Sequence, residues 1–373
     1  MPAVLVAGSL QDQLERLRRR VMGMLVRAGT NEAIRALERL RDQEPDRDTV
    51  RYHLVEARQN QADTTWSPLS IDDLWKMLSA EESAPSELAG DASEALPSIA
   101  PVSPERRDAP RAEIGELLAS VQVLVETATN VETAAVHAAM RPLPGQMALV
   151  VGSLGLATYT IGMLGKYAIA HFQSDMGNEG PNAAQLATND AILETRSKLV
   201  ILVGIAFGLQ PTKQRLGDVL VAQHVTSYEM IKLKPDAIEE RGESLRADAT
   251  LVERIHAHGR SWTFPRADAS SVVFHVGQML SGAKLVNNRD FRDALVRRFP
   301  TALGGEMEGI GAYGAAFRQR VPVLLVKAIC DWADGTKNDR AQPFAAAAAT
   351  DLVRHVLDKA DALAALGVAM AGP

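Results

Sequence analysis

Acidic residues follow several strand-like segments of the chain, where an α/β enzyme would carry its catalytic groups. Glu132 comes after the strand-like segment 121–128, and Asp331 comes after the segment 321–329. Glu308 begins a helical segment that leads into 321–329, so the helix and the strand run in opposite directions. Because ligands of open α/β sheets bind beyond the carboxyl ends of the strands, we expect these carboxylates to converge at one sheet edge.

Clustered carboxyl groups of different acidity suit acid–base chemistry on the bond between a sugar and a base. A carboxylic acid donates a proton to the departing base, while a carboxylate stabilises a cationic sugar and orients a water molecule. The alternative is structural, since acidic residues at strand ends also cap helices. Topology alone leaves both interpretations open for each residue taken singly.

Two turns of small residues are expected beside the carboxylates. The segment Gly204–Gly208 ends the strand-like run 198–206, and Ser281–Val286 follows the run 271–280. The glycines at 204 and 208 serve either a ligand or the packing of a helix on the sheet. The sequence has no G-x-G-x-x-G fingerprint, so no dinucleotide cofactor is predicted. Its histidine and cysteine spacings match no metal motif, so no metal is predicted.

The elements that must position these groups are strands alternating with helices, from about residue 113 to residue 373. Strand-like runs fall at 121–128, 147–154, 157–164, 167–174, 198–206, 217–225, 271–280 and 321–329, and helical runs fall near 181–195, 288–299, 308–320 and 341–360. This pattern predicts an α/β domain with a mixed central sheet flanked by helices on both faces.

Residues 1–80 are predicted to form a small all-α domain, joined to the α/β domain by a flexible linker over residues 81–112. Apolar residues recur there at helical spacing, and Ile34, Leu37 and Leu40 form the stripe of one such helix. The linker is rich in proline, serine, alanine and glutamate, so it cannot bury a core. No catalytic set is visible in residues 1–80, which favours an adaptor role.

Composition excludes several classes of protein. The chain has 373 residues, of which 46% are hydrophobic and 23% charged, as in ordinary globular proteins. Its net charge of -6 argues against a nucleic-acid partner, and its single cysteine, Cys330, excludes a disulfide framework. No uncharged apolar stretch reaches about 18 residues, which argues against a membrane span. The amino-terminal pattern does not fit a signal peptide, so we predict a cytoplasmic protein.

Five motifs in a fixed order carry a family resemblance. LVGIAFGL, GDVLVA, an SG loop, GGEMEGIG and VPVLLVKAICDWAD follow one another between about residues 120 and 360. In these motifs the chain resembles the nucleoside phosphorylase and nucleosidase superfamily. The resemblance implies a nucleoside phosphorylase-like fold and a site for a purine nucleoside.

The resemblance also implies roles for individual residues. Glu308 would hold the ribose hydroxyls, Asp331 would protonate the departing base, and Glu132 would activate water. Met307 would pack on the sugar, and the backbone of the SG loop would meet the base edge. The substrate-binding residues predicted in this way are Met307, Glu306, Gly204, Ile205, Ala206, Phe207, Leu285, Val286, Lys337 and Arg340.

Departures from the family pattern bear on the reaction. Ile205 stands where phosphorylases have a serine that holds phosphate together with a preceding arginine, so no phosphate clamp is evident. Cys330 replaces the usual serine before the catalytic aspartate, and Leu285 stands where some relatives stack an aromatic ring on the base. We therefore predict hydrolysis by water, with a phosphate-dependent phosphorylase as the alternative.

A second resemblance concerns the segment VKAICDWADGTKNDRAQPFAAAAATDLVRHVL, which is similar to nucleosidase effector modules of bacterial signalling and antiphage proteins. It implies an ATP-like substrate and a role in antiphage defence or signalling. Lys337 and Arg340 would face a 5′-phosphate chain; the alternative is a solvated loop. We also predict a homo-oligomer and a protein partner for residues 1–80. A catalytically silent nucleotide-binding module is the other alternative.

Overall fold

The computed structural model divides the chain into two compact units. The larger comprises Ala92–Glu229 and Gly242–Pro373, and the smaller comprises Met1–Asp91 with Met230–Arg241. The structure describes residues 101–178, 180–234, 238–335 and 339–371, together with residues 31, 34, 35, 37–39, 96 and 97.

Little of the smaller unit is described. Described residues between Asn31 and Arg39 are helical, and Ile34 and Leu37 are buried, in agreement with the helix predicted there. The rest of the predicted all-α domain lies outside the described residues. The same unit contains the antiparallel pair β8 (Ile231–Leu233) and β9 (Ile238–Glu240), which the sequence did not predict.

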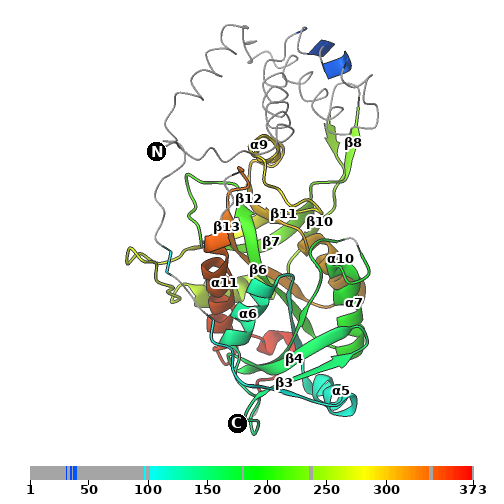
Figure 1. The fold of residues 1–373 in the computed structure, drawn as a ribbon, viewed down its shortest axis with the longest axis vertical. Helices are drawn as coiled ribbons and strands as arrows, with labels where there is room; N and C mark the ends of the chain where they lie inside the picture. Colours follow the sequence, from blue (N-terminus) through cyan, green and yellow to red (C-terminus); the bar gives the residue numbers. More distant parts are fainter. Residues whose placement is uncertain are drawn as a thin grey trace, which may run out of the picture. The chain divides into compact units, whose positions relative to one another are not determined.

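One mixed sheet of 11 strands forms the centre of the larger unit, as far as it is described (Figure 1). The strand order is β1-β3-β4-β5-β2-β6-β12-β11-β7-β10, and β13 pairs with both β6 and β7. The strands β6, β12, β11, β7 and β13 therefore close into a ring. The bounds are β1 (Arg106–Asp108), β2 (Val123–Thr127), β3 (Leu149–Leu154), β4 (Ala157–Leu164), β5 (Tyr167–Gln173), β6 (Leu199–Gly208), β7 (Val219–Ser227), β10 (Ser244–Arg246), β11 (Phe274–Ser281), β12 (Ala302–Glu306) and β13 (Val323–Asp331).

The central strands are buried on both faces. The neighbours β5, β2, β6 and β13 are parallel, and every residue of β2 is buried. This explains why their sequences read as continuous apolar runs rather than as alternating patterns. The antiparallel strands β3, β4 and β5 are joined by turns at Gly155 and Gly165, whose positive φ of 58° fits two-residue hairpin turns.

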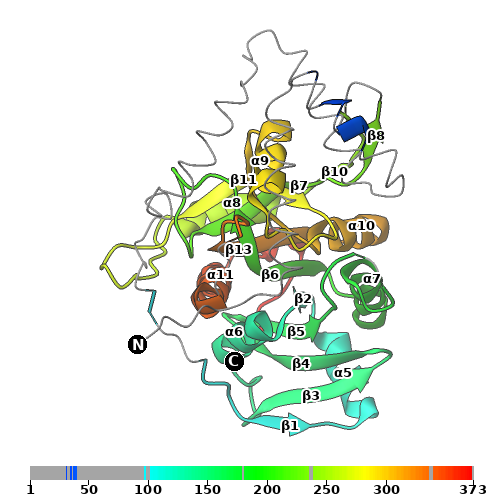
Figure 2. The same cartoon turned by 45° about the horizontal axis from the view of Figure 1, so that its top comes forward.

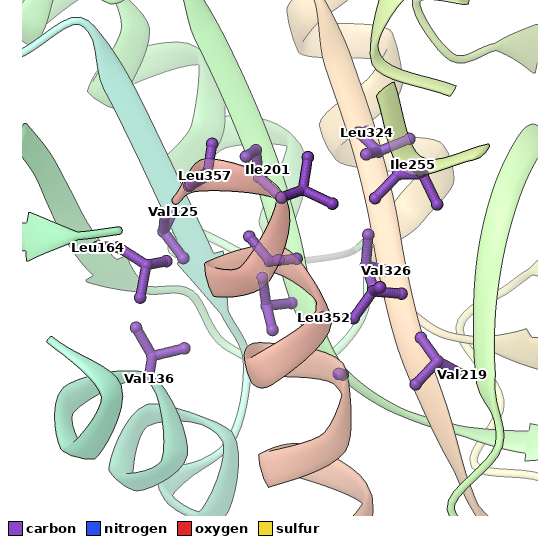
Figure 3. Close-up of a cluster of buried hydrophobic side chains, with 14 of the residues drawn as sticks. Val125, Val136, Leu164, Ile201, Val219, Ile255, Leu324, Val326, Leu352 and Leu357 are labelled. Atoms are coloured by element: carbon purple, nitrogen blue, oxygen red, sulfur yellow. The ribbon is translucent and has the colours of Figure 1, made fainter. Parts of the chain in front are cut away.

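Helices cover both faces of the sheet (Figure 2). One face packs against α6 (Asn130–Ala139), α8 (Ala249–Gly259) and α11 (Gln342–Leu357), and the other packs against α5 (Arg111–Ser120), α7 (Ala184–Thr195) and α10 (Gly309–Gln319). A further helix, α9, spans Arg289–Arg298. Figure 3 shows Val125, Ile201 and Val326, from three neighbouring strands, gathered with Leu352 and Leu357 of α11.

The predicted fold class is confirmed for the larger unit, since all eight predicted strands are present within a few residues of their predicted bounds. The sequence analysis missed β12. This strand, ALGGE, is short and contains two glycines, which have low strand propensity. The predicted linker 81–112 was wrong at its end. Arg106–Asp108 forms the edge strand β1 beside β3, and α5 begins at Arg111. No helix among the described residues is long and apolar enough to span a membrane.

Candidate active site

Glu132 lies at the third position of α6 and uses its two carboxylate oxygens differently. Its Oε2 accepts the backbone N–H groups of Ala128 and Thr129, each at 2.8 Å, and thereby completes a capping box with Thr129. Its Oε1 accepts the N–H of Ile205 at 2.7 Å and faces Lys327 Nζ at 3.2 Å. Glu132 is therefore both a helix cap and a member of the site.

Lys327 connects the two carboxylates that the sequence singled out. Its Nζ lies 3.2 Å from Glu132 Oε1 and 3.2 Å from Glu308 Oε2, and the side chains of all three residues are at most 7% exposed. Burial alone would lower the pKa of this lysine, but Glu132, Glu308 and Glu306 outweigh burial and raise it. The lysine therefore stays charged, and the bridge is a buried ion triad.

Sequence reasoning missed Lys327. The signal was available, because a lysine stands inside the otherwise apolar buried strand β13. A lysine at such a position is almost never buried without a partner. Its partners come from two distant segments. The sequence placed both carboxylates at one sheet edge but did not predict a lysine between them.

Glu308 is the N-cap residue of α10, yet its side chain makes no capping bond. Its Oε1 accepts the N–H of Gly177 at 3.1 Å, and its Oε2 faces Lys327. The capping role falls to Glu306, whose Oε2 accepts the N–H groups of Glu308 and Gly309 at 3.0 and 2.8 Å. The structural interpretation thus fits Glu306, while the Glu308 carboxylate is turned toward the ion triad.

Gly204 leaves the space that the triad occupies. It lies beside Lys327 in the register of β6 and β13. A Cβ at this position would lie 1.8 Å from Glu132 Oε1 and 2.8 Å from Lys327 Nζ. The glycine is required here for close approach, not for its backbone angles.

Asp331 lies farther along the same pair of strands, opposite Phe207. Phe207 is three positions beyond Gly204, which corresponds to roughly 10 Å along a strand. The Asp331 Oδ1 accepts the N–H of Ala333 at 2.8 Å, and the Cys330 thiol donates to Oδ2 at 3.3 Å. Asp331 is half-buried, so one end of the site is open to solvent.

The antiparallel pairing of β12 with β6 explains how Glu308 reaches the triad. Gly304 pairs with Gly208 and Gly305 with Phe207, so the chain returns along β6 toward Gly204 as it approaches Glu308. The expected common sheet edge is therefore an extended site along β6 and β13, with Glu308 and Asp331 at different levels.

The loop that follows β5 also contributes to the site, and the sequence did not predict this. Gly177 donates to Glu308, and Asn178 Oδ1 accepts the N–H of Gly311 at 3.1 Å, which ties the loop to the first turn of α10. Met307 is half-buried, and its ε-methyl would lie 3.8 Å from a Cβ placed on Gly177. The loop thus lies beside both Met307 and Glu308.

The remaining predicted residues surround these groups to different degrees. Ile205 is half-buried, and Ala206, Phe207 and Val286 are buried, whereas Leu285 is 62% exposed. Asn287 Oδ1 accepts the N–H of Gly335 at 3.0 Å and thereby links the SG loop to the loop after Asp331. Arg340 is exposed, and Lys337 lies outside the described residues. The part of the chain that is described contains no cluster of side chains suited to a metal ion.

The sequence profile of the phosphorylase superfamily matches residues 123–360. The chain belongs to the phosphorylase superfamily. The match spans the sheet from β2 onward, through every carboxylate of the site, to the end of α11.

Individual members of the phosphorylase superfamily resemble the chain over shorter lengths. It is 31% identical over 258 residues to a death domain-containing ATP nucleosidase of Amphimedon queenslandica, covering 64% of this chain and 48% of that protein. It is 28% identical over 199 residues to ATP nucleosidase Cap17 of Escherichia coli, covering 47% of this chain and 38% of that protein. The chain thus spans half or less of the length of these curated relatives.

Solved superfamily structures share the fold. The 5′-methylthioadenosine/S-adenosylhomocysteine nucleosidase of Neisseria meningitidis matches with a TM-score of 0.53 and 20% identity, covering 63% of this chain and 98% of that one. The futalosine hydrolase of Helicobacter pylori matches with a TM-score of 0.53 and 19% identity, covering 64% and 98%.

Proposed function

We propose that the chain hydrolyses the N-glycosidic bond of a purine nucleoside or nucleotide and releases the free base. The observation that carries the proposal is the buried triad of Glu132, Lys327 and Glu308, with Asp331 farther along the same pair of strands. The names of the relatives support it, since those from Amphimedon and Escherichia are called ATP nucleosidases.

The order of groups along β6 and β13 matches the order of sugar and base in a nucleoside. Glu308 accepts hydrogen bonds from the ribose hydroxyls and stabilises the positive charge that develops on the sugar. Asp331 donates a proton to the purine as the bond between C1′ and the base nitrogen breaks, and the bonding electrons leave with the base. Glu132 accepts a proton from the water whose oxygen bonds to C1′.

Hydrolysis fits the site better than phosphorolysis. The Ile205 N–H already donates to Glu132, and its side chain is an apolar group with no hydrogen-bonding capacity. A phosphate ion needs charged or polar donors in fixed positions, and this segment offers none beyond its backbone. Water needs only the Glu132 carboxylate to orient it.

The test is to incubate the purified chain with adenosine, ATP, guanosine and GTP, with and without inorganic phosphate, and to separate the products by chromatography. We expect free base and ribose or ribose 5′-phosphates without added phosphate. Ribose 1-phosphate formed only in the presence of phosphate would instead establish a phosphorylase. Binding of a nucleotide with no product under either condition would favour the silent binding module.

An ATP-like substrate and control by residues 1–80 complete the proposal. Arg340 lies nine residues past Asp331 and is exposed, and we assign it to the 5′-phosphate chain. Arg340→Gln should then raise the KM for ATP and leave the KM for adenosine unchanged.

Control by residues 1–80 is supported by the Amphimedon relative. Its name states that it contains a death domain, so a nucleosidase accompanies another domain there. A role in antiphage defence predicts that infected cells expressing the chain, but not its Asp331→Asn variant, lose ATP.

A further inference from the structure

Glu126 is a buried carboxyl group that the proposed mechanism does not use. It lies in the middle of β2, with Phe172 of β5 and Leu202 of β6 as its strand neighbours, and it is 1% exposed. Its Oε2 accepts the Thr188 hydroxyl at 2.5 Å. Its Oε1 is buried and has no hydrogen-bond partner among the residues that the structure describes.

The charges around Glu126 belong to the site. Glu308 and Lys327 both act on it electrostatically, and Glu306 and Glu132 lie beyond them as partners of that pair. The acidic residues of α7, Asp190 and Glu194, face Tyr159 instead. Ser174 Oγ approaches Glu126 without completing a well-formed hydrogen bond. The four buried glutamates among the described residues therefore share one buried lysine.

The compensation of these four carboxyl groups is unequal. Glu132 and Glu308 each face Lys327 and accept backbone N–H groups, and Glu306 accepts two backbone N–H groups. Glu126 has a single hydroxyl donor on one oxygen. An ionised carboxylate with so little compensation is unfavourable in a buried site, so Glu126 carries a proton. Glu306 Oε1 also has no hydrogen-bond partner among the described residues, and burial together with Glu308 raises the pKa of Glu306 to about 7.

We propose that Glu126 is a positioning residue that must stay neutral for Lys327 to bridge Glu132 and Glu308, and that its ionisation inactivates the site. A negative charge on Glu126 would attract the Lys327 ammonium and repel the Glu308 carboxylate. The bridge that orients both groups would then be distorted, although Glu126 itself has no contact with the substrate in the proposed mechanism. This inference rests on the proposed hydrolysis.

The acidity of Glu126 agrees with this geometry. Burial raises its pKa to about 8, against the Thr188 and Ser174 hydroxyls, which favour the ionised form. Glu308 raises the pKa further, and Lys327 lowers it. Glu126 is thus protonated below pH 8 and ionised above it, so its effect on activity appears as a loss on the alkaline side.

The experiment compares the pH profiles of kcat for the full chain and for Glu126→Gln, which mimics the protonated acid and can still accept the Thr188 hydroxyl. Below pH 7 the variant should stay within about threefold of the wild type, because both are neutral at this position. Its alkaline midpoint should lie about one pH unit or more above that of the wild type, because the ionisation of Glu126 is removed.

Two further variants make the test specific. Thr188→Val removes the donor that favours the carboxylate, so the pKa of Glu126 rises and the alkaline midpoint should also move to higher pH. Glu194→Gln is the matched control on the same helix and should leave the midpoint unchanged. An unchanged midpoint in both Glu126→Gln and Thr188→Val would overturn the inference.

Infrared titration separates this inference from the proposed function. In the wild type, a protonated-carboxyl carbonyl band should disappear between pH 7 and about pH 9, and this component should be missing from Glu126→Gln. If the chain hydrolyses no nucleoside yet loses this band, the proposed function fails and Glu126 is still the buried acid. If the band is identical in both proteins, the inference fails whatever the activity.

Discussion

The α-carbon of Gly204 is so close to the Glu132 carboxylate that a Cβ on it would lie 1.8 Å from Oε1 and 2.4 Å from Cδ. The two residues come from β6 and α6, which are separated by three strands and a helix in the chain. Their contact allows the Ile205 N–H to reach Glu132 at 2.7 Å and fixes the carboxylate against the strand.

Gly204→Ala should therefore disable the site. The added methyl group displaces Glu132, and because Glu132 is held by three backbone donors, the strain cannot be relieved by a simple rotation. We expect a loss of at least about 10²-fold in kcat/KM and of about 1–3 kcal/mol in the free energy of unfolding.

The matched control is Gly115→Ala, because Gly115 lies inside α5 and a Cβ there meets no atom within 4 Å. It should keep full activity and gain a few tenths of a kcal/mol, up to about 1. Equal activity of the two variants in a steady-state assay would contradict the packing argument.

Lys327→Met should be destabilising as well as inactive. It leaves Glu132 and Glu308 buried without the cation between them, and breaking a buried ion pair by removing one partner costs about 3–5 kcal/mol. Urea denaturation followed by circular dichroism measures this loss.

Lys198→Met serves as the control, since Lys198 is exposed and its Nζ donates only to the Gly367 carbonyl among the described contacts. We expect it to change the free energy of unfolding by less than about 1 kcal/mol. If Lys327→Met were as stable as this control, the triad would contribute nothing to the fold.

The parts of the fold that the sequence predicted are those whose signal is local. Strands such as β2 and β6 read as unbroken apolar runs because both of their faces are buried, so each could be recognised from its own residues. Topology predicted that Glu132, Glu308 and Asp331 share one sheet edge; in the structure Glu132 and Glu308 meet at Lys327, whereas Asp331 lies farther along β13.

What the sequence could not provide depends on contacts between distant segments. Glu306 and Glu308 are two residues apart, and which of them caps α10 depends on where that helix begins relative to β12. The role of Lys327 depends on Gly204 being opposite it in the register of β6 and β13. Glu126 stands in an apolar strand with no local sign that it lies behind the site.

Asp331→Asn should abolish base release while leaving the fold intact. The amide keeps the shape of the side chain and loses the proton that the departing base needs, which corresponds to about 10²- to 10⁴-fold in rate. Chromatographic detection of free base measures the activity, and thermal unfolding monitors the fold.

Two variants near Asp331 define what that loss means. Cys330→Ser replaces the thiol donor to Asp331 by a hydroxyl donor and should stay active. Asp293→Asn removes a carboxylate that contacts Arg292 at the surface and should have no effect. Activity of Asp331→Asn within a few-fold of these two would remove Asp331 from the mechanism.

The last prediction concerns where the catalytic domain begins. Leu96 packs against the core on the α11 side of the sheet, and β1 pairs with β3 through the register Arg106↔Leu149 to Asp108↔Val151. Arg107 also donates to Gln146 at 3.0 Å and to Glu113. A fragment that begins at Ala92 keeps these contacts, whereas a fragment that begins at Arg111 loses an edge strand and exposes β3. We therefore expect the longer fragment to fold and retain basal hydrolysis. The shorter one should unfold at a lower temperature or aggregate, because an uncovered edge strand pairs with other chains.

The same fragment tests the regulatory role of residues 1–80. If these residues control the enzyme, the longer fragment should lose any dependence of its activity on protein concentration or on a partner. A dilution series of both the fragment and the full chain measures this dependence. An insoluble fragment from Ala92 would place the amino-terminal residues in the core of the enzyme and contradict the regulatory role.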